Sequence, residues 1–273
     1  MEFVMMTGLD GSGREEEALG CGYPVVHTEE EALTLLRSGQ SAVLDAPNLR
    51  ARSRKAFLER IRKLECKTRV VLVARNIETC CAALPQRREE IRAQYLAFYP
   101  PYAYEGWDEI ELRYAPDAKM ITPAELFFGK EGLVFLSQDN PFHKHSVGMH
   151  CIRAARITAQ KKPQDAALWC ASLLHDIGKA KTKAFVDSKG NPSATAHYYG
   201  HEFASAYESL FVQLPKAVRE EERLRIGALI SWHMMPHHFI GSEKTRERYL
   251  RLWGEDFMND VLIIEQADRG AQN

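Results

Sequence analysis

The sequence predicts a two-domain protein, in which an α/β domain with a parallel sheet precedes an all-α helical bundle. The chain of 273 residues is longer than the roughly 150 residues of an average domain. Before about residue 115, short runs of consecutive apolar residues are typical of strands buried on both faces of a parallel sheet. From Asn140 onward helical periodicity dominates. We therefore expect domains at 1–115 and 140–273, joined by a connector at 116–139 that has no sustained period.

The composition is that of an ordinary soluble protein, with 45% hydrophobic and 27% charged residues. A net charge of -1 argues against a chain that coats nucleic acid electrostatically. The six cysteines form no CxxC pair, which favours reduced thiols in the cytoplasm over zinc-finger chemistry. No apolar run approaches the roughly 18 residues of a membrane span, and the first residues turn polar too soon for a signal peptide. We expect a cytoplasmic protein with no membrane partner.

The expected strands of the first domain are three apolar runs at Glu2–Gly8, Ser41–Leu49 and Thr68–Asn76. A helix rich in basic residues follows the second run, because Arg50–Lys63 holds seven basic residues and one acidic residue. A solvated helix face is the default interpretation. The alternative is a guide for a nucleic-acid end, to which three more arginines would contribute: Arg87, Arg88 and Arg92.

A loop follows the first strand and fills the frame GxxxxGK[ST] in all but its last two positions. Arg14 replaces the lysine that contacts phosphates, and Glu15 replaces the hydroxyl that contacts magnesium. The acidic first helical turn would satisfy the helix dipole and repel a triphosphate. We therefore expect no nucleotide in this domain and an anion site that is filled internally. The candidate nucleotide-binding residues are those of the degenerate loop: Gly8, Gly11, Ser12, Gly13 and Arg14.

Two further segments make residues 2–114 resemble the P-loop polynucleotide kinases of RNA repair. "VLDAPNLRARSRKAFLERIRK" is similar to their strand end and basic helix, and "PPYAYEGWDEIEL" to the segment that closes their lid region. The resemblance implies a P-loop kinase-like fold of reduced size. About a dozen residues separate Gly13 from "VVH", which are too few for the usual helix and aspartate-bearing strand. We expect a pseudo-kinase for recognition or scaffolding, in which Asp45 caps the loop before Asn48.

In the second domain, polar residues lie on the apolar faces of five expected helices. His150, for example, shares a face with Val147, Ala154 and Ile157. Burial of one such group is costly unless something neutralises it, whereas a shared divalent cation accepts imidazole nitrogen and carboxylate oxygen together. The candidate metal ligands are His150, His175, Asp176, His201, His233 and Asp268. Four other histidines are expected on surface loops: His143, His145, His237 and His238.

The six candidate ligands follow one another along the chain, and the adjacent His175 and Asp176 lie within "LLHDIGK". In this pattern, Asn140–Asn273 resembles the HD-domain metal-dependent phosphohydrolases. "NPFHKHSVGMH" and "HYYGHEFA" are also similar to HD domains attached to tRNA nucleotidyltransferases. The resemblance implies an all-α HD-domain bundle with one metal on four ligands and a second metal that uses the later histidines. Carried over to this chain, the first set is His150, His175, Asp176 and Asp268, and the later histidines are His201 and His233.

Asp176 is the candidate catalytic residue at the centre of this site. A carboxylate can bridge two cations about 3.5 to 4 Å apart, which then activate water as the nucleophile. Lys179 follows Gly178, a residue type that often ends helices. Lys179 has two open interpretations, as a catalytic cation that contacts the substrate phosphate or as a partner of the helix dipole. The ligand set does not distinguish among divalent metals: Mn, Fe, Co, Ni, Zn and Mg.

The leading hypothesis is therefore a divalent-metal phosphohydrolase, either a phosphatase or a phosphodiesterase. Its expected partner is a phosphorylated small molecule, a nucleotide, or an RNA or DNA end. Two alternatives remain open. The protein could be a non-catalytic nucleotide sensor, or a polynucleotide 5'-kinase in which Arg14 stands in for the lysine.

Overall fold

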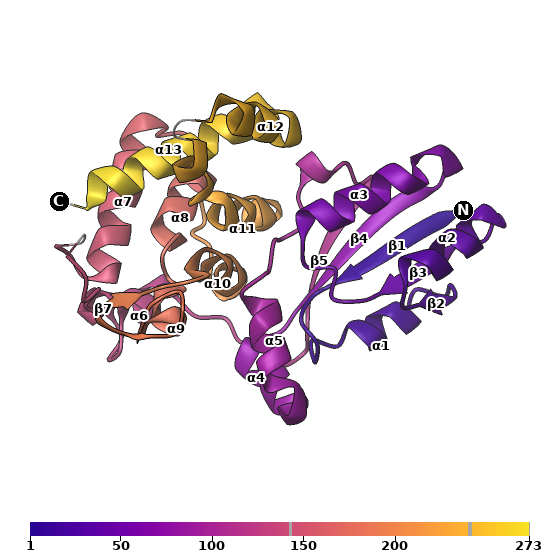
Figure 1. Cartoon of the computed structure of the whole chain (residues 1–273), viewed down its shortest axis with the longest axis horizontal. Helices are drawn as coiled ribbons and strands as arrows, with labels where there is room; N and C mark the ends of the chain where they lie inside the picture. Colours follow the sequence, from indigo (N-terminus) through magenta and orange to yellow (C-terminus); the bar gives the residue numbers. More distant parts are fainter. Residues whose placement is uncertain (142–143, 240–241, 273) are drawn as a thin grey trace. The chain divides into compact units, whose positions relative to one another are not determined.

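The structure is a computed structural model that describes residues 1–141, 144–239 and 242–272 (Figure 1). The chain divides into two compact units, Met1–Lys119 and Met120–Asn273. The division falls within the predicted connector at 116–139. The first unit is built on a parallel sheet and the second is helical, which confirms the two-part arrangement that the sequence predicts.

The first unit contains a five-stranded parallel sheet in the order β2-β3-β1-β4-β5. The central strand β1 pairs with β3 and β4, so that Val4 lies opposite Val43 on one side and Arg69 on the other. The strands are β1 (Glu2–Thr7), β2 (Val25–Val26), β3 (Ala42–Asp45), β4 (Lys67–Ala74) and β5 (Glu109–Tyr114).

Helices cover both faces of this sheet, which explains the consecutive apolar residues of β1 (Figure 1). Phe3 and Met5 point to one face and pack with residues of two helices, α2 (Glu29–Arg37) and α3 (Ala51–Ile61). Val4 and Met6 point to the other face, which packs with residues of α1 (Arg14–Leu19). The remaining helical segments of the unit are α4 (Ile77–Ala83), α5 (Arg88–Tyr95), η1 (Arg62–Leu64), η2 (Pro85–Arg87) and η3 (Ala103–Glu105).

Two elements of this unit differ from the sequence expectation. The segment after the degenerate loop holds both a helix and a strand in shortened form, since α1 has six residues and β2 has two. The end of the segment interpreted as closing a lid belongs to β5 instead, at the edge of the sheet. The charged side chains of β5 hid the strand in the sequence, and they pair with the neighbouring strand, as Glu111 does with Arg69 at 2.7 Å.

The basic helix α3 is only partly a solvated face. Arg54 is 1% exposed and makes two hydrogen bonds to the buried carboxylate of Glu105, at 2.8 and 2.5 Å. Trp107 donates a further hydrogen bond to Glu105. Arg60 forms ion pairs with Glu29 and Glu30 of α2. Arg54 therefore stabilises the core of the unit and is not exposed to contact a nucleic acid.

The second unit is a helical bundle in which α7 packs against α8 and α13, and α11 packs against α8 and α10. No helix of the described residues combines the length and apolar character needed to cross a membrane. The helices are α6 (Pro123–Phe128), α7 (Val147–Lys161), α8 (Ala166–Leu174), α9 (Lys179–Thr182), α10 (His201–Glu208), α11 (Arg223–Trp232), α12 (Glu243–Trp253) and α13 (Glu255–Ala271). Short 3-10 segments are η4 (Leu133–Phe135), η5 (Ser209–Phe211), η6 (Glu220–Glu222) and η7 (Met235–Phe239).

The expectation of a purely helical second domain is wrong at one place, an antiparallel hairpin of β6 (Ala184–Val186) and β7 (Pro192–His197). Local turn chemistry forms it. The Asp187 carboxylate accepts hydrogen bonds from the backbone amides of Lys189 and Asn191, and Gly190 takes a positive φ of 84°. The hairpin leads directly into α10.

Candidate metal centre

The first predicted ligand lies on α7, a helix whose start is fixed by a side-chain cap. The Ser146 hydroxyl accepts a hydrogen bond from the amide of Met149 at 3.3 Å. With the helix starting at this residue, Val147, His150 and Ala154 face the interior, and the His150 side chain is completely buried. An imidazole therefore projects from the apolar face of α7, as the periodicity predicts.

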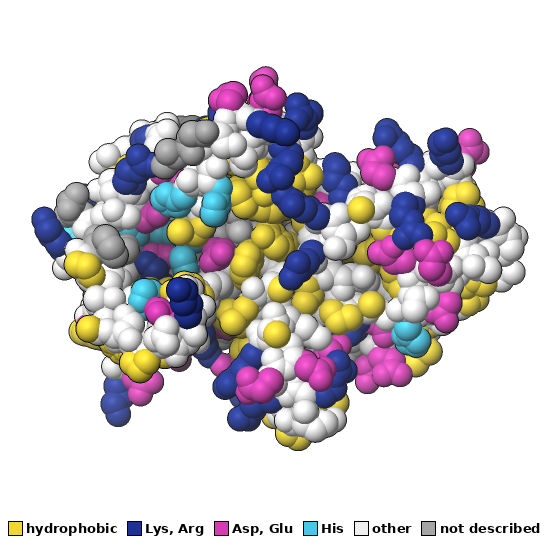
Figure 2. All heavy atoms as spheres, viewed as in Figure 1, with side chains coloured by type: hydrophobic (Ala, Val, Ile, Leu, Met, Phe, Trp, Pro, Cys, Tyr) yellow, Lys and Arg dark blue, Asp and Glu magenta, His cyan; other side chains and the backbone are white. Residues whose placement is uncertain are grey.

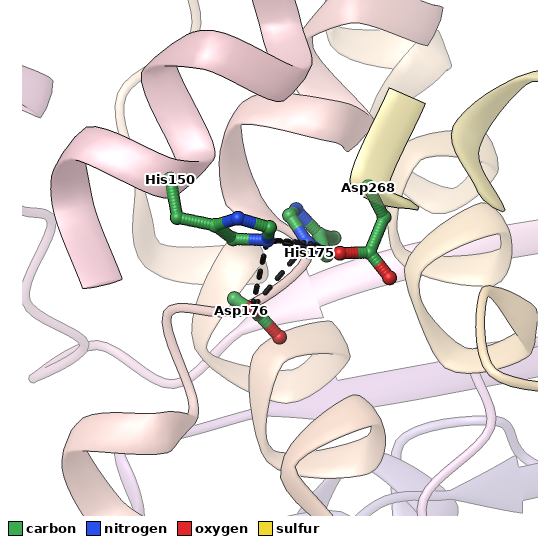
Figure 3. Close-up of side chains that lie close together, drawn as sticks. All are labelled: His150, His175, Asp176 and Asp268. Carbon is green, nitrogen blue, oxygen red and sulfur yellow. Dashed lines mark hydrogen bonds and ion pairs between the residues drawn. The ribbon is translucent and has the colours of Figure 1, made fainter. Parts of the chain in front are cut away.

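The other three ligands of the first set come from two helices that contact α7. His175 and Asp176 directly follow α8, and His175 retains helical dihedral angles. Asp268 lies on α13, one turn after the buried Ile264. Figure 3 shows the four side chains pointing toward one another from these separate helices.

The distances among these four side chains suit a common metal ion. His150 Nε2 lies 3.2 Å from His175 Nε2, 2.9 Å from Asp268 Oδ1 and 3.4 Å from Asp176 Oδ2. His175 Nε2 lies 3.4 Å from Asp176 Oδ2 and 3.6 Å from Asp268 Oδ1. Two donors bound about 2.1 Å from one ion must lie roughly 3 to 4 Å apart, depending on the angle between them. These five distances meet this condition, and all four ligand atoms lie within 4.8 Å of one another.

A second set of ligand atoms shares Asp176 with the first. Asp176 Oδ1 lies 3.2 Å from His201 Nε2, at the first residue of α10, and His233 directly follows α11. The three ligand atoms lie within 4.8 Å of one another. His233 Nε2 is buried and has no hydrogen-bond partner among the residues that the structure describes. Asp176 therefore presents one oxygen to each set, the arrangement expected of a bridging carboxylate.

Backbone carbonyls fix the tautomers of three of these histidines. Nδ1 lies 2.7 Å from the Ser172 carbonyl in His175, 2.8 Å from the Tyr198 carbonyl in His201, and 2.7 Å from the Ile230 carbonyl in His233. A carbonyl oxygen only accepts hydrogen bonds, so Nδ1 carries the proton in each ring. In the neutral imidazole the lone pair is then on Nε2, the atom that points into the cluster.

The electrostatics of the cluster keep Asp176 charged and His233 neutral. Burial alone would raise the pKa of Asp176, but Lys179, His175 and His201 together hold that pKa well below its usual value. Burial would lower the pKa of His175, yet the charge of Asp176 and a hydrogen bond with Asp268 hold it well above the ordinary value. For His233, burial and then the neighbouring imidazoles lower the pKa to about 3.

Lys179 is a buried partner of Asp176 and not a surface lysine at a helix end. Its Nζ lies 2.6 Å from Asp176 Oδ2, and the side chain is 6% exposed. The predicted helix-ending role of Gly178 is wrong, since Gly178 has a negative φ of −65° and precedes α9. Glycine is required there because a Cβ would lie 2.5 Å from the backbone nitrogen of Ser205 in α10.

Sequence reasoning missed one residue of this environment, Gln138. It is 2% exposed, and its Oε1 accepts a hydrogen bond from Lys179 Nζ at 2.9 Å. Its backbone carbonyl accepts a hydrogen bond from the Tyr198 hydroxyl at 2.5 Å. Gln138 lies in the predicted connector, where no periodicity marks a buried position, so only its tertiary contacts identify it.

A cavity of about 430 Å³ opens beside the cluster and is lined in part by Asp176, Lys179, His201 and Asp268. Figure 2 shows histidine side chains gathered around a hollow on this face of the helical unit. Of the four histidines expected on surface loops, His237 is exposed and lines the cavity. His238 is exposed, His145 is half-buried, and His143 lies outside the described residues.

In the degenerate loop of the first unit, charged side chains neutralise one another. Arg14 Nη1 lies 2.6 Å from Asp45 Oδ1, and Arg14 Nη2 lies 2.7 Å from Asp10 Oδ1. The other oxygen of Asp10 forms an ion pair with Arg87 at 2.8 Å and accepts a hydrogen bond from Gln94 at 2.5 Å. Asp45, which we expected to cap the loop, is an ion-pair partner of Arg14.

The glycines of the loop take backbone conformations that favour glycine. Gly8, Gly11 and Gly13 all have positive φ angles, and a Cβ on Gly8 would lie 2.4 Å from the Val73 carbonyl oxygen. The Ser12 hydroxyl is buried and has no hydrogen-bond partner among the described residues. A cavity of about 360 Å³ adjoins Arg14 and both of its carboxylate partners. Nucleotide binding at this loop stays a prediction.

Comparison with known proteins supports the geometry of the helical unit. No curated protein matches the chain. Residues 145–271 match the family model of the HD domain, and this range contains all six predicted metal ligands. The match does not extend to the first unit, so the resemblance of residues 2–114 to P-loop kinases stays a prediction. The helical unit is thus similar to HD domains, which are in general metal-dependent hydrolases, and the sequence resemblance in this half is confirmed.

Proposed function

We propose that the protein is a divalent-metal-dependent phosphohydrolase, a phosphatase or phosphodiesterase that acts on a nucleotide or a nucleic-acid end. One observation carries the proposal: two sets of ligand atoms share the Asp176 carboxylate inside a unit that matches the HD domain. The pseudo-kinase unit would serve in recognition or scaffolding.

The residues present fit divalent metal ions on chemical grounds. Imidazole nitrogens and carboxylate oxygens face one another, and His233 Nε2 is buried without a partner among the described residues. One ion would be held by His150, His175, Asp176 and Asp268, and a second by Asp176, His201 and His233. Divalent cations at such a site supply Lewis-acid polarisation of a phosphoryl group and lower the pKa of water.

The chain's own groups contribute binding and orientation. The carbonyls that hold Nδ1 of three histidines fix the imidazole rings before any ion binds, which reduces the reorganisation needed for binding. The Lys179 ammonium lines the cavity beside Asp176, and its positive charge would attract an anionic phosphate oxygen. We propose this phosphate contact as the catalytic role of Lys179.

The proposal is tested by metal content and hydrolysis before and after Asp176→Ala. Purified protein should contain a divalent metal and hydrolyse at least one of three substrates: a phosphomonoester, a 2',3'-cyclic nucleotide or an RNA end. The substitution removes the shared ligand, so bound metal and turnover should be lost together. Asp256→Ala is the control, because it removes an exposed carboxylate from α13, the helix that carries the ligand Asp268, without removing a ligand. Loss of metal with unchanged hydrolysis would contradict the proposal.

A further inference from the structure

Two aromatic rings at the end of the hairpin lie on the wall of the cavity beside the candidate metal centre. The rings of His197 and Tyr199 are parallel within 7°, with centroids 5.4 Å apart. His197 ends β7, and Tyr199 lies in the turn before α10. Both residues line the cavity of about 430 Å³, and Tyr199 is 50% exposed. A half-exposed Tyr199 ring, stacked on His197, therefore borders the cavity.

Polar contacts at the ring edges hold these two rings in place. His197 Nε2 lies 3.1 Å from the Ser193 hydroxyl, and His197 Nδ1 lies 3.3 Å from the Tyr199 hydroxyl. These contacts restrain the orientation of the His197 ring and of the half-exposed Tyr199 ring. A large aromatic side chain kept exposed and oriented at a cavity is suited to contact a ligand by its face.

The aromatic pair is close to the charged end of the cavity. His201 follows Tyr199 by two residues, a separation that the backbone can span by no more than about 7 Å. The same cavity is lined by Asp176 and Lys179. Its volume is within the range of about 300 to 1,000 Å³ that small-molecule sites occupy. A ligand that fits both ends carries an anionic group and a planar ring a short distance apart.

We propose that His197 and Tyr199 form a nucleobase platform, on which the base of a nucleoside phosphate stacks while its phosphate lies at the metal centre. This inference rests on the proposed function and narrows it. A nucleoside phosphate combines the anion and the flat ring, whereas a sugar phosphate offers the anion alone. Stacking of one base on an aromatic side chain corresponds to about a ten- to hundredfold change in affinity.

The first test compares kcat/KM for adenosine 5'-monophosphate and ribose 5-phosphate in the metal-loaded protein. Tyr199→Ala should reduce the preference for the nucleotide by about ten- to a hundredfold, chiefly through KM. Tyr199→Phe keeps the ring and should retain the preference. Phe185→Ala is the matched control, because Phe185 is a similarly exposed aromatic residue on β6. An unchanged preference in Tyr199→Ala, or an equal loss in Phe185→Ala, would overturn the platform.

A binding measurement separates failure of the platform from failure of the proposed function. Isothermal titration of the metal-loaded protein with adenosine and with ribose needs no turnover, because neither compound carries a phosphate. Tighter binding of adenosine that Tyr199→Ala abolishes would support the platform, even if no substrate is hydrolysed. Hydrolysis of adenosine 5'-monophosphate and ribose 5-phosphate with equal kcat/KM would retain the hydrolase and eliminate the platform.

Discussion

Both units of this protein bury charged side chains, but they neutralise them in different ways. In the first unit, the Arg14 guanidinium donates hydrogen bonds to Asp10 and Asp45. In the second unit, His150 and His175 bring their Nε2 atoms within 3.2 Å of each other, and His150 lies 2.9 Å from an Asp268 oxygen. The first cluster pairs donors with acceptors. The second brings together imidazole nitrogens and carboxylate oxygens, the groups that hold a divalent metal ion.

This difference indicates which cluster requires a ligand. A guanidinium between two carboxylates satisfies the charges with groups of the chain itself. Imidazole nitrogens and carboxylate oxygens that face one another repel unless a proton or a cation lies between them. Lys179 neutralises part of the negative charge on Asp176. The buried Nε2 of His233 has no hydrogen-bond partner among the described residues. Buried charge by itself therefore does not identify a binding site. A buried cluster whose acceptors outnumber its donors does indicate one.

The largest expected difference between the clusters is in metal binding. Asp268→Asn replaces a charged ligand with a neutral amide, so the affinity for divalent metal should fall by about a hundredfold or more. Substitution of a residue that only supports a metal ligand already lowers metal affinity by about 10- to 100-fold. Asp10→Asn, the matched change in the first unit, should leave metal content unchanged. Elemental analysis of both variants after dialysis checks the prediction. Equal metal loss in both would refute the assignment of the site to the second unit.

The buried ion pair of the first unit should dominate the effects of substitutions on its stability. Arg54→Met leaves the Glu105 carboxylate buried, and both side chains of this pair are 0% exposed. We expect the free energy of unfolding to fall by about 3 to 5 kcal/mol. Lys67→Met removes an exposed pair with Glu109, which solvent screens, so its effect on the free energy of unfolding should be far smaller. Denaturant unfolding of the two variants measures both changes, and similar values would contradict the role of burial.

Metal removal should act on one unit and not on the other. A ligand present at 100 times its dissociation constant stabilises the folded state by about 2.7 kcal/mol. Addition of a chelator should therefore lower the unfolding temperature of the helical unit, while the sheet unit stays unchanged. Hydrogen exchange resolved by segment measures the two units separately. A uniform loss of protection across both units would contradict this prediction.

The smallest expected effect is the pH dependence of a carboxylate in the second unit. Burial alone would raise the pKa of Asp165, but its hydrogen bonds with Arg225 and with the Leu168 amide hold that pKa below its usual value. A depressed pKa means that the pair stabilises the fold above the unfolded pKa of about 3.9, and that this contribution is lost as the pH falls through the folded pKa. Asp165→Asn should therefore be less stable than wild type near pH 7.

Unfolding curves of wild type and Asp165→Asn between pH 3 and 7 check this sign, because the difference between them should shrink below about pH 4. Asp117→Asn provides the comparison in the first unit. The Asp117 carboxylate pairs with Arg75 but is 47% exposed, so solvent screens it and its effect should be smaller. A difference for Asp165→Asn that is constant over this pH range would show that its pair does not depend on charge.

Periodicity was sufficient to predict the helices of the metal centre. Val147, His150 and Ala154 all lie on the buried face of α7, as their spacing requires. Elements whose signal is weak in the sequence were less predictable. The edge strand β5 alternates apolar and charged residues because one side pairs its charges with β4, and β6 and β7 form through a five-residue turn.

The sequence by itself determined which helices of the second unit carry histidines and carboxylates on their buried faces, because an amphipathic helix carries that information in the spacing of its side chains. It also determined the class of chemistry, since imidazoles and carboxylates that share an apolar face need a cation. Only the tertiary structure decided which partners meet. It brought Gln138 from an aperiodic segment to Lys179 and divided the oxygens of Asp176 between two ligand sets. It also enclosed Arg14 between Asp10 and Asp45. Apart from the local pair of Arg14 and Asp10, most of these pairings are long-range contacts between elements, and no local pattern of residues records them.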